Sequence, residues 1–198
     1  MRAAIVRAYT DFSMLRDGDR LLIGLSGGKD SLSLLILMLM LQEKSPVRIE
    51  IGACTVDPMY PGFDPSPLKH FLATLGVPYF YESQPIIDLA AEHMGRESIC
   101  AWCSRMKRGI LYTTARREGY NVLVLGQHLD DFAESFVMSA FRNGLLRTMK
   151  AHYLNDAGDI RIIRPLVYVR ERQTREFAAA MALPIINENC PACYTGPT

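Results

Sequence analysis

Short apolar runs alternate along the chain with longer segments that have helical patterning. The apolar runs predict buried strands over residues 20–25, 50–56, 77–81, 122–125 and 160–166. The segments between and after them predict helices over residues 29–41, 64–75, 104–118, 130–141 and 171–182. This alternation predicts an α/β fold, a parallel sheet flanked by helices on both faces. In such a sheet, ligands bind at the carboxyl ends of the strands.

The length of 198 residues favours one domain over 1–198, with a C-terminal tail that carries two cysteines. Hydrophobic residues make up 49% of the chain and charged residues 22%, which is typical of a globular protein and excludes disorder, collagen and coiled coil. The longest apolar run, 34–41, is too short to span a bilayer. Since no signal peptide is recognisable at the start, we expect a cytoplasmic protein without membrane contact.

Charge is unevenly distributed between the two halves of the chain. Residues 1–99 carry nine basic and twelve acidic side chains, a net −3, and residues 100–198 carry thirteen and nine, a net +4. The basic half fits contacts with RNA phosphates, but from charge alone a solvated helix surface is the favoured explanation.

A glycine-rich loop, Gly24-Leu-Ser-Gly-Gly-Lys-Asp-Ser31, joins the first predicted strand to a helix. Glycines allow backbone N–H groups to approach an anion, and the following helix directs its positive end to the same place. The Walker A spacing and the dinucleotide fingerprint are both absent. The loop therefore predicts a phosphate site of another kind, rather than a simple turn. The residues expected to bind nucleotide are Leu25, Ser26, Gly27, Gly28, Lys29, Asp30, Ser31 and, after the fourth strand, Gly126.

Four of the five cysteines form two C-x-x-C pairs, Cys100/Cys103 and Cys190/Cys193, with 86 residues between them. In a chain without an export signal this pattern favours metal or redox chemistry over disulfides. Thiolates bind either Zn²⁺ or an iron–sulfur cluster, and the spacing leaves both open. The first pair is expected in a loop before a helix, and Cys54 is expected in the core.

Two carboxylates follow the fourth predicted strand, Asp130 and Asp131. A carboxylate at this position can hold Mg²⁺ bound to a triphosphate, or it can cap the next helix. His128, in the same loop, suits either a phosphate contact or a structural role.

The loop Ser-Gly-Gly-Lys-Asp-Ser resembles the PP-loop of the ATP pyrophosphatase superfamily. The wider sequence resembles the tRNA 2-thiocytidine synthetases and the related iron–sulfur-dependent tRNA 2-thiouridine synthetases, over about residues 15–195. The resemblance rests on Cys100-Ala-Trp-Cys-Ser-Arg-Met-Lys-Arg-Gly-Ile-Leu-Tyr112, Gly126-Gln-His-Leu-Asp-Asp131, Ile163-Arg-Pro-Leu166, Arg170-Glu171 and Leu183-Pro-Ile-Ile186. It implies an adenine nucleotide alpha-hydrolase-like, Rossmann-like fold. It also implies an enzyme that adenylates a nucleobase carbonyl with ATP and replaces the oxygen by sulfur, acting on cytidine C2 of tRNA.

The resemblance also implies cofactors and partners. Three cysteines hold a [4Fe–4S] cluster in these families. Cys100 and Cys103 match two of them, Cys190 or Cys193 matches the third, and the spare cysteine is expected nearby. Lys107 matches a lysine that contacts ATP or substrate. A sulfur donor such as a cysteine desulfurase and a homodimer are further expectations. The alternatives are an adenylating ligase or small-molecule thiolation enzyme with structural Zn²⁺, and a non-catalytic redox sensor.

Overall fold

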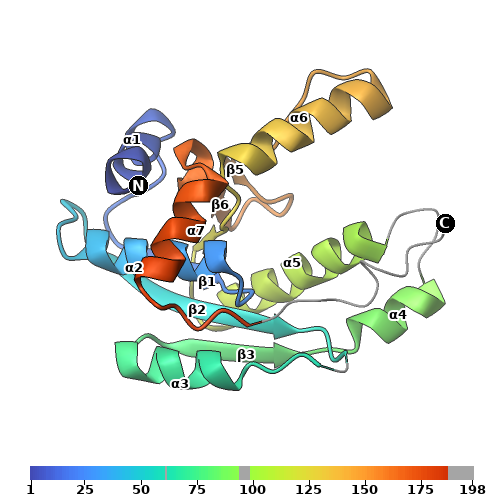
Figure 1. The fold of residues 1–198 in the computed structure, drawn as a ribbon, viewed down its shortest axis with the longest axis horizontal. Helices are drawn as coiled ribbons and strands as arrows, with labels where there is room; N and C mark the ends of the chain where they lie inside the picture. Colours follow the sequence, from blue (N-terminus) through green and yellow to red (C-terminus); the bar gives the residue numbers. More distant parts are fainter. Residues whose placement is uncertain (61, 94–98, 187–198) are drawn as a thin grey trace.

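A six-stranded sheet forms the centre of the computed structural model, which describes residues 1–60, 62–93 and 99–186. The strand order is β3-β2-β1-β4-β6-β5, and all neighbours are parallel except β5, which is antiparallel to β6 (Figure 1). The strands are β1 (Asp19–Gly24), β2 (Ile49–Asp57), β3 (Tyr79–Ser83), β4 (Val122–Val124), β5 (His152–Leu154) and β6 (Arg161–Ile163). The predicted α/β class is confirmed.

Helices pack on both faces of this sheet. They are α1 (Arg2–Asp11), α2 (Lys29–Gln42), α3 (Ser66–Leu75), α4 (Ile86–His93), α5 (Ile99–Arg117), α6 (Leu129–Asn143), α7 (Glu171–Ala180) and a short 3₁₀ helix, η1 (Pro165–Tyr168). None of the helices in the described residues has the length and hydropathy to cross a membrane.

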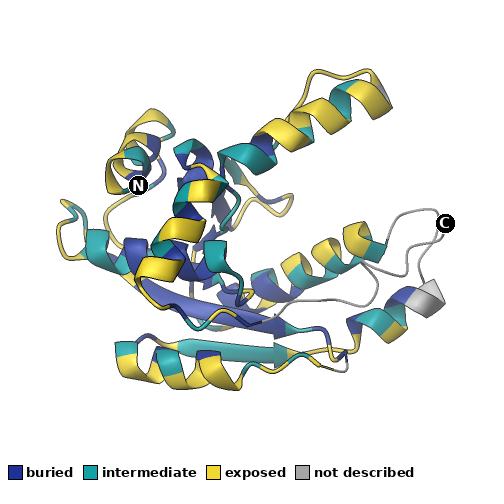
Figure 2. Ribbon diagram, in the orientation of Figure 1, coloured by how far each residue is buried: buried dark blue, intermediate teal, exposed yellow. Residues whose placement is uncertain are grey.

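Side chains of β1 alternate between two apolar clusters, as strand geometry requires. Leu21 and Ile23 pack with residues of α1, α2, α3 and α7 on one face. Leu22 packs on the other face with Cys54 and with Ile110 of α5. Cys54 is 1% exposed, so its prediction as a core residue is confirmed. Figure 2 shows the buried sheet between layers of more exposed helix surface.

Several boundaries differ from the sequence prediction. The predicted strand 160–166 is wrong beyond Ile163, because Pro165 begins η1 and a proline cannot donate to the sheet. Helix α7 ends at Ala180, two residues early. The sequence pattern did not predict α1, α4 or β5. The three β5 residues are not buried, so the strand has no apolar run to signal it.

A buried ion pair ties β1 to β6 at the amino end of the sheet. The Asp19 carboxylate accepts a short hydrogen bond from the Arg161 guanidinium, and both side chains are almost fully buried. Arg161 also donates to the Met14 carbonyl at 3.2 Å, and Asn121 donates to Asp19 at 3.2 Å. This network fixes the end of the sheet that lies opposite the glycine loop.

Candidate active site

A cleft of about 560 Å³ opens at the carboxyl ends of β1 and β4. Its wall contains the start of the glycine loop, the turn after β4, the middle of α5 and the first turn of α6. Residues far apart in the chain therefore meet here, as parallel topology predicts. The lining includes Ser26, Ser31, Lys107, Gly126, Asp131 and Arg164.

The glycine loop closes tightly at the start of α2. Gly27 has φ +94°, a conformation that favours glycine, and Gly28 is the N-cap residue of α2. The Gly28 N–H donates to Ser26 Oγ at 3.3 Å, and Ser31 Oγ donates back to the Gly28 carbonyl at 3.0 Å. No side chain of the described residues caps α2. Its first N–H groups can therefore bind an anion that enters the cleft.

Lys29 lies beside the cleft and pairs with two carboxylates. Its Nζ is 3.0 Å from Asp30 Oδ2 and 3.0 Å from Glu171 Oε1 of α7. Partial burial disfavours the ammonium, but the hydrogen bonds to Asp30 and Glu171 outweigh it and raise the pKa of Lys29 above its usual value. Thr174 donates to the other Asp30 oxygen, so α7 holds both charged residues of the loop.

The two predicted carboxylates of α6 have different surroundings. The helix begins at Leu129 rather than at Asp130, and its N-cap is His128, whose ring accepts from the Asp131 N–H. Asp131 Oδ2 accepts from the His128 N–H at 2.7 Å, completing a capping box, and Asp131 lines the cleft.

Asp130 faces α7 and is not a lining residue of the cleft. It accepts from the Glu171 N–H at 2.7 Å and pairs with Arg170 at 2.8 Å. The Glu171 N–H, aided by the Arg170 charge, holds the pKa of Asp130 below its usual range. Asp130 therefore joins the start of α6 to the start of α7.

Cys100 and Cys103 lie in the first turns of α5, so their prediction as loop residues is wrong. Helical structure places residues three apart on one side of the helix. Cys100 is exposed and Cys103 half-buried. Lys107, one turn after Cys103, lines the cleft.

Cys190 and Cys193 lie outside the described residues, within which no group of three potential metal-binding side chains occurs. Two accessible thiols one helical turn apart can supply two ligands to a cluster or to Zn²⁺. The described part of the chain thus fits a metal group and requires further ligands from elsewhere.

Sequence reasoning did not assign Arg108, Gln127 or Arg164 to the site. Arg164 is only 5% exposed, yet no described carboxylate pairs with it. Its Nε donates to Gln127 Oε1 at 2.9 Å, its Nη1 donates to the Lys150 carbonyl, and its guanidinium lies 5.3 Å from the Tyr153 ring centroid. The dipeptide Arg-Pro after β6 carries no chemical signal by itself, since only the fold brings it to the cleft.

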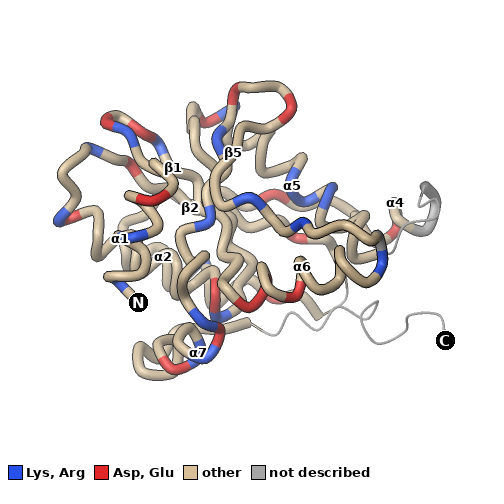
Figure 3. The backbone as a smooth tube through the Cα atoms, turned by 90° about the horizontal axis from the view of Figure 1, so that it is seen from above, with Lys and Arg blue, Asp and Glu red and all other residues tan. Residues whose placement is uncertain are grey.

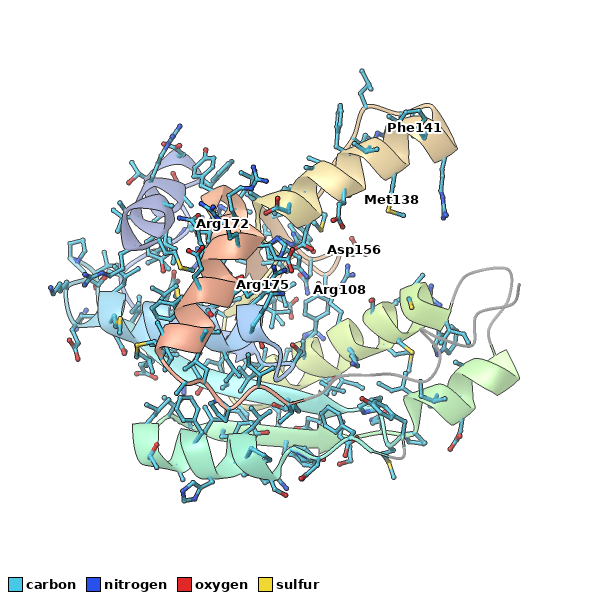
Figure 4. The ribbon with its side chains drawn as sticks, viewed as in Figure 1. Arg108, Met138, Phe141, Asp156, Arg172 and Arg175 are labelled. Carbon is cyan, nitrogen blue, oxygen red and sulfur yellow. The ribbon has the colours of Figure 1, made fainter. Side chains whose placement is uncertain are left out.

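The cleft carries an excess of positive charge. Lys107, Arg108 and Arg164 line it, against Asp30 and Asp131. Figure 4 labels Arg108 on α5, in the space between α5 and α6. Basic residues also follow the chain along α5 and beside α6 in Figure 3. Such a cleft suits a polyphosphate, because its charges offset those of the ligand.

Known proteins are similar to this chain over nearly its whole length. A tRNA-cytidine(32) 2-sulfurtransferase of Geobacter sulfurreducens is 40% identical over 98% of the chain, which covers 76% of that protein. Its counterpart from Pelobacter propionicus is 38% identical over 96% of the chain, which covers 71% of it.

Solved structures share the fold. The U34-tRNA thiolase NcsA of Methanococcus maripaludis, with its [4Fe–4S] cluster, has a TM-score of 0.78 at 21% identity and covers 96% of this chain, which spans 66% of that protein. A phosphoadenylyl-sulfate reductase from Candida auris has a TM-score of 0.55 at 10% identity, covering 93% of this chain and 81% of its own. Residues 1–189 match the PP-loop domain. The chain therefore belongs to the PP-loop family, which includes the tRNA-cytidine(32) 2-sulfurtransferases.

Proposed function

We propose that this chain is an ATP-dependent tRNA thiolation enzyme that exchanges the C2 oxygen of a cytidine for sulfur. One observation carries the proposal: a single cationic cleft connects the glycine loop to the face of α5 where Lys107 follows Cys103 by one turn. The names of the two sulfurtransferases and of the thiolase support the tRNA substrate and the chemistry.

The first step is adenylation. The base carbonyl oxygen attacks the α-phosphorus of ATP, the bond to the β-phosphate breaks, and pyrophosphate leaves. Loop N–H groups and Lys29 bind the triphosphate, and Arg164 offsets the charge that develops during the displacement. Asp131 would hold Mg²⁺ at the cleft. Asp130 is the neighbouring residue, and its contacts with the start of α7 hold it in position. The nucleotide-binding set is Leu25, Ser26, Gly27, Gly28, Lys29, Asp30, Ser31 and Gly126.

The second step exchanges the activated oxygen for sulfur. A sulfide attacks the base carbon, and AMP leaves with the original oxygen. Cys100 and Cys103, with Cys190 or Cys193, would hold a [4Fe–4S] cluster that presents the sulfide when bound. Lys107 follows Cys103 by one helical turn and lines the same cleft as the glycine loop, which supports a role for its ammonium in neutralising the leaving AMP.

Partners follow from this chemistry. A tRNA is the substrate, a donor such as a cysteine desulfurase supplies the sulfur, and the reaction takes place in the cytoplasm. Self-association as a homodimer is supported by exposed apolar side chains on and after α6, where Phe141 is 88% and Leu146 78% exposed. In Figure 1 this helix projects away from the sheet.

The test combines metal analysis with nucleoside analysis. Protein purified without oxygen is expected to contain about four irons and four sulfides. With ATP, a sulfur donor and unmodified tRNA, it should release pyrophosphate and form 2-thiocytidine, measured by mass spectrometry of digested tRNA. Cys100→Ser should lose the iron, and Cys54→Ser, a matched buried control, should keep it. A colourless protein with one zinc and no sulfide would contradict the sulfur transfer and favour an adenylating ligase.

A further inference from the structure

Two hollows of the surface adjoin at Gln127, in the turn that follows β4. One is the cleft at the glycine loop, and the other, of about 600 Å³, runs along α6 past Ser135 and Met138. Gln127, Asp131 and Met149 line both of them. In Figure 4 the Met138 side chain points from α6 toward the side of α5. A base that enters along α6 therefore meets Gln127 on its way to the glycine loop.

Arg164 fixes the orientation of the Gln127 amide. A guanidinium has five N–H donors and no acceptor, so the group that faces Arg164 Nε at 2.9 Å must be the amide oxygen, Oε1. The amide nitrogen, Nε2, lies on the other branch of the side chain and has only donors to offer. Arg164 is itself held by the Lys150 carbonyl and lies beside the Tyr153 ring, so the amide cannot reverse without losing its partner.

The Gln127 amide nitrogen is accessible to a ligand. No described group accepts a hydrogen bond from it, since the contact with Arg164 engages the oxygen. The buried side-chain polar atoms that lack a partner in the described residues are Tyr79 Oη, Trp102 Nε1 and Thr114 Oγ1. Gln127 Nε2 lacks a partner and is not one of these atoms, so it is not buried. The wall of the cleft thus presents two N–H donors without a competing acceptor.

Cytosine and uracil differ at N3, the ring atom beside the C2 carbon whose oxygen is exchanged. N3 of cytosine is a hydrogen-bond acceptor, whereas N3 of uracil carries a hydrogen and is a donor. Uracil also has to lose this N3 proton when its O2 forms the bond to phosphorus and the base becomes neutral again. An amide whose oxygen is already bound to Arg164 offers that proton no acceptor.

We propose that Gln127, oriented by Arg164, selects cytidine over uridine at the adenylation step. Its Nε2 donates to N3 of cytosine and meets the N3–H of uracil as a second donor. A site built to bind one partner rejects an analogue that leaves its polar group unpaired, here by about 20-fold or more in kcat/KM. The inference rests on the proposed function, because it requires a pyrimidine beside the glycine loop.

Pyrophosphate release with matched tRNA transcripts tests this selection in the full chain, purified without oxygen. The transcripts differ only at the target base, which is cytidine, uridine or 3-deazacytidine, a base with C–H in place of N3. The wild-type chain should favour the cytidine transcript over each of the other two by about 20-fold or more in kcat/KM. Values within about twofold of cytidine for both would overturn the contact with N3, without need of any variant.

Variants separate selection from general effects on the rate. Gln127→Glu keeps an oxygen for Arg164 and replaces the donor by a second oxygen, which accepts from N3 of uracil. It should lower the preference for cytidine over uridine at least about tenfold, although its charge slows both reactions by compensating Arg164. Gln127→Met, which lacks both polar groups, should also lower the preference. Gln173→Glu is the matched control on α7, outside the cleft, where the oxygen still accepts from the Arg170 N–H, and it should keep the wild-type preference.

The outcomes distinguish this selection from the proposed function. A wild-type preference that persists in both Gln127 variants would overturn the role of Gln127, and so would an equal loss of preference in Gln173→Glu. Equal rates of the wild-type chain with cytidine and uridine would overturn the selection and leave adenylation in place. A wild-type chain that releases no pyrophosphate with any of the transcripts overturns the proposed function itself, and the selection with it.

Discussion

At the scale of single residues, the cleft depends on charges with quite different surroundings. Lys29 is balanced by Asp30 and Glu171, so its charge is already compensated without a ligand. Arg164 is buried, and its partners among the described residues are carbonyl, amide and aromatic groups. A buried cation without a carboxylate partner is costly, and a bound phosphate removes that cost.

Replacing Arg164 should therefore affect catalysis strongly. Arg164→Gln is expected to lower kcat/KM for pyrophosphate release about 10- to 100-fold, the effect of one charge-assisted hydrogen bond. Arg172→Gln, on the exposed side of α7, is the matched control and should leave the rate unchanged (Figure 4). Steady-state assays over a range of ATP concentrations measure both. An equal loss in the two variants would argue for a general effect of charge.

Substitutions of Asp130 and Asp131 should change the Mg²⁺ requirement of the enzyme to different extents. Asp131→Asn keeps an oxygen for the capping box but loses the charge that lines the cleft. It should raise the Mg²⁺ concentration for half-maximal rate about tenfold or more, a change of at least 1.4 kcal/mol. Asp130→Asn loses the ion pair with Arg170, which lies outside the cleft. It should raise the Mg²⁺ concentration for half-maximal rate less than about twofold. Magnesium titrations of both variants measure these shifts. A larger shift in Asp130→Asn than in Asp131→Asn would place the cation beside Asp130.

The sequence predicted the site residues of the loop better than their partners. Residues 26–31 are contiguous in the sequence, so the motif itself predicts that they share one binding role. Gln127 and Arg164 meet only because β4 and β6 are adjacent in the sheet, and no spacing in the sequence encodes that contact.

At the scale of elements, strands were predicted well where burial is complete. The central residues of β1 and β2 and all three residues of β4 are buried and mostly apolar, because helices cover both faces of these strands. The start of α5 was misplaced because cysteines carry little helical signal and suggest a metal loop instead. Helix α1 was missed because only Ile5 and Ala8 of its ten residues are buried, leaving a weak pattern.

The contact between Gly27 and Ile186, a residue in the segment that follows α7, predicts a measurable coupling between substitutions at these two positions. Gly27→Ala should destabilise the protein by roughly 1–3 kcal/mol, because alanine is strained at this φ and collides with Ile186. Ile186→Ala should cost roughly 2–5 kcal/mol through lost packing. The double variant should cost at least about 0.5 kcal/mol less than the sum, because removing Ile186 relieves the collision. Urea unfolding of the four proteins measures this difference, and strict additivity would contradict direct contact.

At the scale of the whole molecule, the two ends of the sheet have separate tasks. The carboxyl end holds the cleft, and the amino end holds the buried network of Asp19, Arg161 and Asn121. Asp19 and Arg161 are 142 residues apart in sequence, so their pairing joins the first and last parallel strands of the chain.

Breaking the buried network of Asp19, Arg161 and Asn121 should strongly destabilise the protein. Arg161→Ala should lower the free energy of unfolding by about 3–5 kcal/mol, because it leaves the buried Asp19 carboxylate without its partner. Arg48→Ala, which breaks the exposed pair with Asp17, should leave the urea midpoint unchanged. Similar urea midpoints for both variants would show that the Arg161–Asp19 pair does not contribute this much to the free energy of unfolding.

The buried thiol of Cys54 can serve as an internal probe of unfolding. Desolvation raises the pKa of its thiol to about 12, so at neutral pH almost none of the reactive thiolate is present. Cys100, by contrast, is exposed. An alkylating reagent therefore modifies Cys100 in the folded chain without a cluster, and reaches Cys54, a 1% exposed residue in the wall of the cleft, only when the structure around β2 opens. The time course of labelling at Cys54, read by mass spectrometry, counts openings of the central sheet without any added probe.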